Sequence, residues 1–132
     1  MAVRGVASMP SAPLAGRRML VIEDEYFLAD DLARDLASLG AEILGPVGDF
    51  ADAERIVRSG TPIDAALVDI NIKSELVYPL ADTLRALNVP FVFTTGYDRN
   101  SVAAGFEDVP VWEKPINLPA LIHDLAGMMA KR

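Results

Sequence analysis

The sequence predicts an α/β fold with a doubly wound, five-stranded parallel sheet, and three observations lead to this class. From residue 19 onward, short apolar runs alternate with stretches of helical periodicity, which is typical of repeated βαβ units. The run at residues 65–70 stays apolar until Asp69, as a strand covered on both faces does. With 132 residues, of which 52% are hydrophobic, the chain is long enough to bury the core of one such domain.

Five segments have the character of strands. We expect them over residues 19–22, 42–47, 65–70, 91–95 and 109–112. The second of these contains Gly45 followed by Pro46. Because proline has no N–H to donate to a neighbouring strand, this segment is expected at an edge of the sheet.

The segments between the strands predict about five helices. The first has leucines at helical spacing on one side and charged residues on the other, and Gly40 ends it. Asp49, Pro79 and Asn117 mark the starts of three more helices, either as side-chain caps or as a first-turn proline. Residues 97–108 have little helical periodicity, so the helix expected there is short or frayed.

Composition excludes several classes of function. The net charge is −7, and residues 19–132 carry −10. An acidic domain repels the phosphate backbone, so direct binding to nucleic acid is not expected. No apolar run reaches the length of about 18–20 residues that a membrane span needs. The lack of cysteine excludes disulfides and zinc–thiolate sites and fits a cytoplasmic protein. Residues 1–17 lack the apolar stretch of a secretory signal and are expected to be a flexible extension of a single domain over residues 18–132.

Polar residues follow or end four of the predicted strands. They are Glu23, Asp24, Asp69, Thr95 and Lys114. Because the carboxyl ends of parallel strands gather at one edge, we expect these side chains to meet in one cleft. Neighbouring carboxylates repel one another, and a bound cation such as Mg²⁺ would offset that cost. An acidic helix N-terminus would explain the first two acids alone, but Asp69 interrupts an apolar strand and favours a site.

A carboxylate in such a cleft can attack phosphorus and form an acyl phosphate. A metal ion and the ammonium of Lys114 would spread the charge on the phosphoryl oxygens. The Thr95 hydroxyl could donate to one of these oxygens, and Gly96 would leave room for the group; strand propensity alone would also explain a threonine there. Pro115 could take a cis peptide bond and fix the backbone of Lys114.

The chain resembles the receiver domains of two-component response regulators over about residues 18–130. The matched positions are the acidic pair for Mg²⁺ (Glu23, Asp24), the phosphoacceptor (Asp69), the residue whose carbonyl completes the metal shell (Asn71), the switch hydroxyl (Thr95) and the phosphate-binding lysine (Lys114). Asp24, Asp69, Thr95 and Lys114 follow one another at spacings of 45, 26 and 19 residues. The resemblance implies a flavodoxin-like fold with strand order 2-1-3-4-5.

Residues 90–97 read Pro-Phe-Val-Phe-Thr-Thr-Gly-Tyr, which is similar to the PFxFATGY motif of a subgroup of single-domain regulators in alphaproteobacteria, with Thr94 in place of alanine. That subgroup is associated with histidine kinases of the HWE and related types and with stress or phosphorelay circuits. A second departure is Val111, which stands where receivers commonly have an aromatic switch residue. Tyr97 and Trp112 are the candidates to take over that role, with Tyr97 favoured, and ordinary packing would also explain either residue.

The resemblance implies a phosphorylated signalling protein rather than an enzyme. A sensor histidine kinase would phosphorylate Asp69 with Mg²⁺, and the signal would pass to a downstream protein by phosphorylation-dependent binding or by phosphorelay. The chain would act as a monomer or weak dimer, with no output domain and no membrane contact. A phosphate-independent binding module is the alternative. A Mg²⁺-dependent phosphohydrolase is disfavoured because such enzymes need a second acid where this chain has Asn71.

Overall fold

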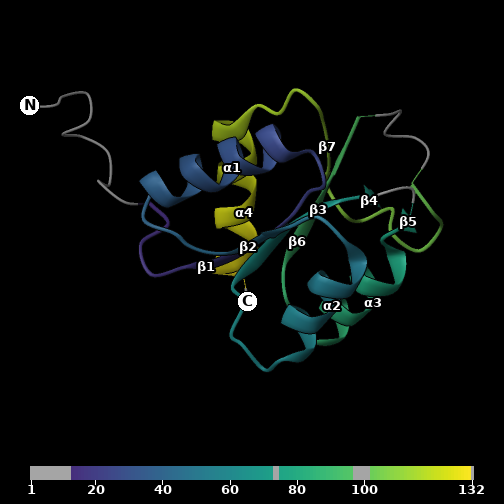
Figure 1. Cartoon of the computed structure of the whole chain (residues 1–132). Helices are drawn as coiled ribbons and strands as arrows, with labels where there is room; N and C mark the ends of the chain where they lie inside the picture. The colour runs from purple at the N-terminus through teal and green to yellow at the C-terminus, as the bar shows by residue number, and fades with distance from the viewer. Residues whose placement is uncertain (1–12, 73–74, 97–101, 132) are drawn as a thin grey trace, which may run out of the picture.

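A parallel β-sheet with helices on both faces forms the centre of the molecule (Figure 1). The structure, a computed structural model, describes residues 13–72, 75–96 and 102–131. Within these residues the sheet has five strands in the order β2-β1-β3-β6-β7, all parallel. Their bounds are Arg18–Ile22 (β1), Glu42–Val47 (β2), Ala65–Asp69 (β3), Phe91–Thr95 (β6) and Val111–Glu113 (β7). Numbered along the chain, these strands have the predicted order 2-1-3-4-5, and the fold class is confirmed.

Helices cover the sheet in two pairs, and each pair closes one part of the core. The described helices are Tyr26–Ser38 (α1), Phe50–Arg58 (α2), Tyr78–Ala86 (α3) and Leu118–Ala130 (α4). One hydrophobic cluster joins the sheet to α2 and α3, and a second joins its other face to α1 and α4 (Figure 1). None of these helices is long and apolar enough to cross a membrane, as far as the described residues go.

Several local predictions agree with the structure. The strand that contains Pro46 lies at the edge of the sheet. Gly40, with φ of +100°, follows the end of α1. The side chain of Asp49 accepts a hydrogen bond from the Asp52 amide at 2.8 Å and caps α2. Asn117 caps α4 in the same way.

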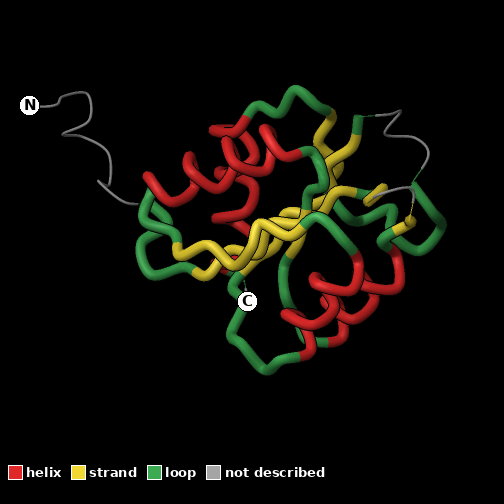
Figure 2. Tube along the Cα trace, viewed as in Figure 1, coloured by secondary structure: helices red, strands yellow, loops and turns green. Residues whose placement is uncertain are grey.

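Three details differ from the sequence-based expectation. A small hairpin of Asn71–Ile72 (β4) and Glu75–Leu76 (β5) follows β3 directly, and no hairpin was expected there. The last strand is Val111–Glu113 rather than residues 109–112, because Pro110 contributes only its carbonyl, to the Phe93 amide. The described residues contain four helices, not about five, and residues 102–110 form turns and loop (Figure 2). Gly105 has φ of +97°, which interrupts helical backbone there.

The N-terminal part of the described chain is packed rather than extended. Leu14 is fully buried in the cluster beneath α1 and α4, and its amide donates to the Leu39 carbonyl at 2.9 Å. The ordered domain therefore includes Leu14, which lies within the extension expected over residues 1–17. Residues 1–12 of that extension lie outside the described residues.

Candidate functional site

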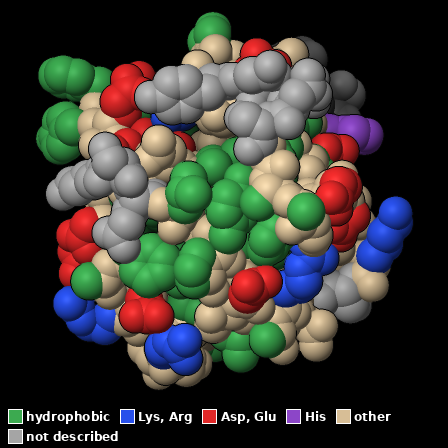
Figure 3. All heavy atoms as spheres, turned by 90° about the vertical axis from the view of Figure 1, so that its right-hand side faces the viewer, with side chains coloured by type: hydrophobic (Ala, Val, Ile, Leu, Met, Phe, Trp, Pro, Cys, Tyr) green, Lys and Arg blue, Asp and Glu red, His purple; other side chains and the backbone are tan. Residues whose placement is uncertain are grey.

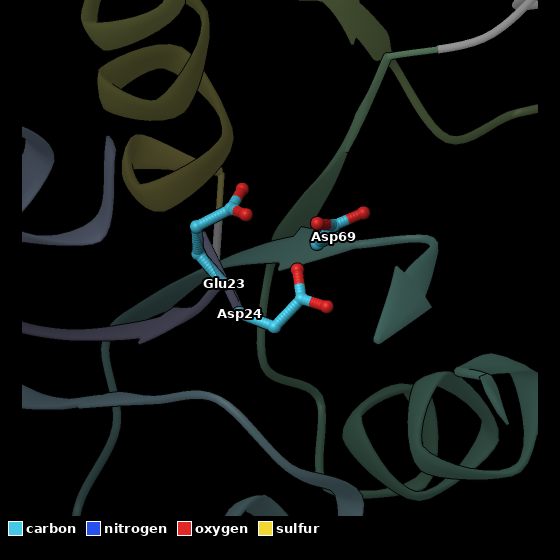
Figure 4. Close-up of side chains that lie close together, drawn as sticks. All are labelled: Glu23, Asp24 and Asp69. Atoms are coloured by element: carbon cyan, nitrogen blue, oxygen red, sulfur yellow. The ribbon is translucent and has the colours of Figure 1, made fainter. Parts of the chain in front are cut away.

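Three carboxylates meet where β1 and β3 end. Glu23 and Asp24 follow β1, and Asp69 is the last residue of β3, the neighbouring strand. One oxygen from each lies within 4.8 Å of the others. Figure 4 shows the three side chains converging on the same space. The adjacency of two parallel strands therefore brings together acids that are 45 residues apart in the chain.

Glu23 is the most deeply buried acid of the group, with 3% of its surface exposed. Its Oε1 lies 2.8 Å from Lys114 Nζ, and its Oε2 accepts a hydrogen bond from the Glu25 amide at 2.9 Å. Burial raises the pKa of Glu23 from 4.5 to about 7, although Lys114 and the Glu25 amide act in the opposite direction. The repulsion of the nearby Asp69 adds to the increase.

Asp69 is held by both of its oxygens and is 5% exposed. Oδ1 accepts from the Asn71 amide at 3.1 Å, and Oδ2 accepts from Lys114 Nζ at 3.1 Å. The same ammonium lies 3.6 Å from Glu25 Oε1. Burial lowers the pKa of Lys114, but its contacts with Glu23 and Asp69 outweigh this effect, so the pKa is raised overall. Lys114 is therefore a charged group within reach of the Asp69 oxygen.

The remaining predicted site residues surround this group. Thr95 ends β6 with 3% of its surface exposed, and its carbonyl accepts from the Lys114 amide at 2.8 Å, which fixes the lysine beside the strand end. Gly96 borders open space, since a Cβ built there would meet nothing within 4 Å. The peptide bond before Pro115 is cis, as expected. Asn71 begins β4, directly beyond Asp69.

The two described positions considered for the switch pack on opposite faces of the sheet. Val111 is half-buried and packs on the α2–α3 side of the sheet, whereas Trp112 packs on the α1–α4 side. The indole nitrogen of Trp112 is buried and has no hydrogen-bond partner in the described structure. Tyr97 lies outside the described residues. Sequence reasoning did not identify Glu25 as a partner of Lys114, and the acidic run 23–25 was its only signal.

The donor atoms fit a small, hard cation. Mg²⁺ prefers oxygen ligands, and three carboxylates are within its reach here. Asn71 touches the group through its backbone amide, which donates to Asp69 Oδ1 at 3.1 Å. Carboxylates held this close together repel one another, and a bound cation would offset that repulsion.

The fold is shared with known proteins. The sequence matches no family model and no curated relative. The solution structure of SdrG from Sphingomonas melonis Fr1 is similar, with 34% identity, a TM-score of 0.75 and coverage of 92% of this chain and 99% of that one. The BeF3-activated conformation of SdrG from Pseudomonas melonis Fr1 has 35% identity and a TM-score of 0.70, covering 87% and 98%. A response regulator receiver protein from Sinorhizobium medicae WSM419 has 26% identity and a TM-score of 0.79, covering 89% and 97%. This chain belongs to the family of response regulator receiver domains.

Proposed function

We propose that this receiver accepts a phosphoryl group on Asp69 from a sensor histidine kinase and signals through the resulting change in its surface. The observation that carries the proposal is the position of Asp69, a nearly buried carboxylate 3.1 Å from the Lys114 ammonium and grouped with two further acids. An aspartate in this setting has a nucleophilic oxygen at the carboxyl end of its strand. The ammonium beside it would stabilise the negative charge of an incoming phosphoryl group.

The transfer needs only one bond exchange. An oxygen of Asp69 forms the new P–O bond while the P–N bond to the donor histidine breaks, and the electron pair of that bond returns to the imidazole. Lys114 is placed to offset the charge on the phosphoryl oxygens, and the Thr95 hydroxyl is proposed to donate to one of them. Glu23, Asp24, Asp69 and the backbone carbonyl of Asn71 are the groups proposed to hold Mg²⁺. The metal would supply positive charge for the transferred group.

The finer assignments rest on the sequence. The run at residues 90–97 supports a kinase of the HWE type and a role as a single-domain regulator or phosphorelay intermediate, with Tyr97 as the proposed switch aromatic. The lack of cysteine supports a cytoplasmic location. A monomer or weak dimer is proposed. One observation favours a second candidate, a phosphate-independent binding module: Val111 is aliphatic where receivers commonly have an aromatic residue.

Phosphorylation by a small donor tests the proposal directly. Wild type, Asp69→Asn and Asp82→Asn are incubated with acetyl phosphate and Mg²⁺ and measured by intact mass. Asp82 is an exposed aspartate in α3, so its variant makes the same chemical change away from the carboxylate group. We expect a hydroxylamine-labile phosphoryl adduct on wild type and Asp82→Asn only. Equal labelling of Asp69→Asn would reject Asp69 as the acceptor. No labelling of wild type by acetyl phosphate or by a phosphorylated kinase would favour the binding module.

A further inference from the structure

Three aromatic side chains form a cluster between α3, β6 and the loop that follows. We call Tyr78, Phe93 and Phe106 the Tyr78 cluster. The ring of Tyr78 lies 5.1 Å from that of Phe106 and 5.8 Å from that of Phe93, the latter edge-on. Phe93 and Phe106 are 5.8 Å apart, so each ring contacts the other two. Figure 3 views the molecule from the side on which β4 and β5 lie, and hydrophobic side chains gather near the centre of this face.

Tyr78 has a polar contact as well as a packing contact. Its hydroxyl oxygen accepts a hydrogen bond from the Ala103 amide at 3.0 Å. Ala103 lies in the segment 102–110, which contains no helix or strand. Apart from Tyr78, the segment is held to α3 by Arg85, which binds both oxygens of Asp108 at 3.0 and 3.2 Å. Its guanidinium also lies 5.0 Å from the ring centre of Phe106.

The Tyr78 cluster lies between the end of β3, which carries Asp69, and the end of β6, which carries Thr95. Tyr78 begins α3, and the preceding Val77 donates its amide to the Ile70 carbonyl, next to Asp69. Phe93 lies two residues before Thr95 in β6. Val111, the position of the usual aromatic switch, has no ring with which to join them. Tyr78 is therefore in contact, through its neighbours, with the acceptor strand, the switch strand and the loop.

We propose that Tyr78 is the positioning residue that couples the state of Asp69 to the segment 102–110, through its hydrogen bond to Ala103. This inference rests on the proposed function. The bond ties the segment 102–110 to the first residue of α3, and Val77 just before α3 donates to the Ile70 carbonyl beside Asp69. A residue couples two sites only if its contacts differ between their two states. In this inference the bond belongs to the unphosphorylated state, and phosphorylation of Asp69 frees the Ala103 amide from Tyr78 and loosens the segment.

Substitution by phenylalanine isolates the hydroxyl, because the ring stays and its packing with Phe93 and Phe106 is kept. If the bond exists only in the unphosphorylated state, its loss favours the other state, and a ligand of that state binds more tightly. The probe is beryllofluoride with Mg²⁺, which imitates the phosphoryl group on an aspartate. The matched control is Tyr26→Phe, because Tyr26 is 75% exposed in α1 and its variant loses the same hydroxyl.

Two measurements test the inference. We expect Tyr78→Phe to bind beryllofluoride about three- to tenfold more tightly than wild type, the effect of one hydrogen bond lost from a single state, and Tyr26→Phe to match wild type. In wild type, beryllofluoride should speed hydrogen exchange of the Ala103 amide and leave that of the Asp52 amide unchanged. The second measurement needs no variant and stands even if Tyr78→Phe folds poorly.

The possible failures are distinguishable. If wild type binds beryllofluoride and Tyr78→Phe binds it equally or more weakly, Tyr78 only stabilises the fold. That result would overturn this inference and leave the proposed function standing. Unchanged exchange at Ala103 would also overturn it. No binding by wild type would reject the proposed phosphoacceptor site, and the inference with it.

Discussion

The buried carboxyl group of Glu23 should give the protein an unusual dependence of stability on pH. Its pKa is raised from 4.5 to about 7, mainly by burial. Between these values the folded state keeps a proton that the unfolded state has lost. The free energy of unfolding therefore falls as pH rises through this range, in the absence of Mg²⁺. The contribution is fully present below pH 4.5 and is lost above about pH 7.

The size of the effect follows from the shift. Each pKa unit corresponds to about 1.36 kcal/mol, so a shift from 4.5 to about 7 amounts to about 3 kcal/mol. Glu23→Gln keeps the shape of the side chain and stays neutral at every pH. Relative to wild type, this variant should gain about 3 kcal/mol of unfolding free energy between pH 4.5 and pH 8.

Urea unfolding of wild type and Glu23→Gln in EDTA, at several pH values between 4.5 and 8, measures this difference. Glu113→Gln is the control, since Glu113 is an exposed carboxylate in β7. Mg²⁺ at pH 8 should stabilise wild type more than Glu23→Gln, because the ionised carboxylate is a proposed ligand of the metal. A difference between wild type and Glu23→Gln that stays constant with pH would refute the reasoning.

Three further predictions concern stability and charge. Lys114→Ala leaves buried carboxylates without their cation, and its unfolding free energy at pH 7.5 should fall by about 3 kcal/mol in urea titrations. Gly45→Ala should lower the free energy of unfolding by at least about 2 kcal/mol more than Gly60→Ala does. Both positions have positive φ, but of the two only Gly45 would bring the new Cβ against backbone, 2.8 Å from the Val47 nitrogen. In Arg85→Ala, NMR titration should find a higher pKa for Asp108, because the Arg85 hydrogen bond holds that pKa below its usual value.

Each of these has a clear contrary result. A loss below about 1 kcal/mol in Lys114→Ala would mean that the acids are stabilised by other groups. Equal losses of unfolding free energy in the two glycine variants would show that the positive φ alone, and not the contact at Gly45, determines the loss. An unchanged Asp108 pKa would show that Arg85 and Asp108 do not pair in solution.

The elements that could be predicted are those whose signal is local in the chain. The runs that became β1, β3 and β6 are apolar and end in polar residues, so both the strands and the meeting of Glu23, Asp24 and Asp69 followed from parallel topology. Pro46 was enough to place its strand at the edge of the sheet, because proline has no N–H to donate to a strand on each side.

The elements that could not be predicted depend on contacts between distant residues. The strands of the β4–β5 hairpin have two residues each, too few to show an alternating pattern. The segment 102–110 is held by Tyr78 and by Arg85, which lies 23 residues before its partner Asp108. Of the adjacent acids, only Glu23 is buried, and that depends on the direction in which the chain leaves β1.

The charges at the site link the cation to the phosphoryl group. One ammonium, that of Lys114, lies within 4 Å of three carboxylates, from Glu23, Asp69 and Glu25, so its single positive charge does not balance the group. Asp24 adds a further acid. Phosphorylation of Asp69 replaces one carboxylate with a group of higher negative charge. Because a divalent cation lowers the cost of that added charge, Mg²⁺ and the phosphoryl group should each strengthen the binding of the other by the same factor. Because the pKa of Glu23 is raised to about 7, this coupling should strengthen as pH rises through neutrality, where Glu23, one of the proposed ligands, loses its proton.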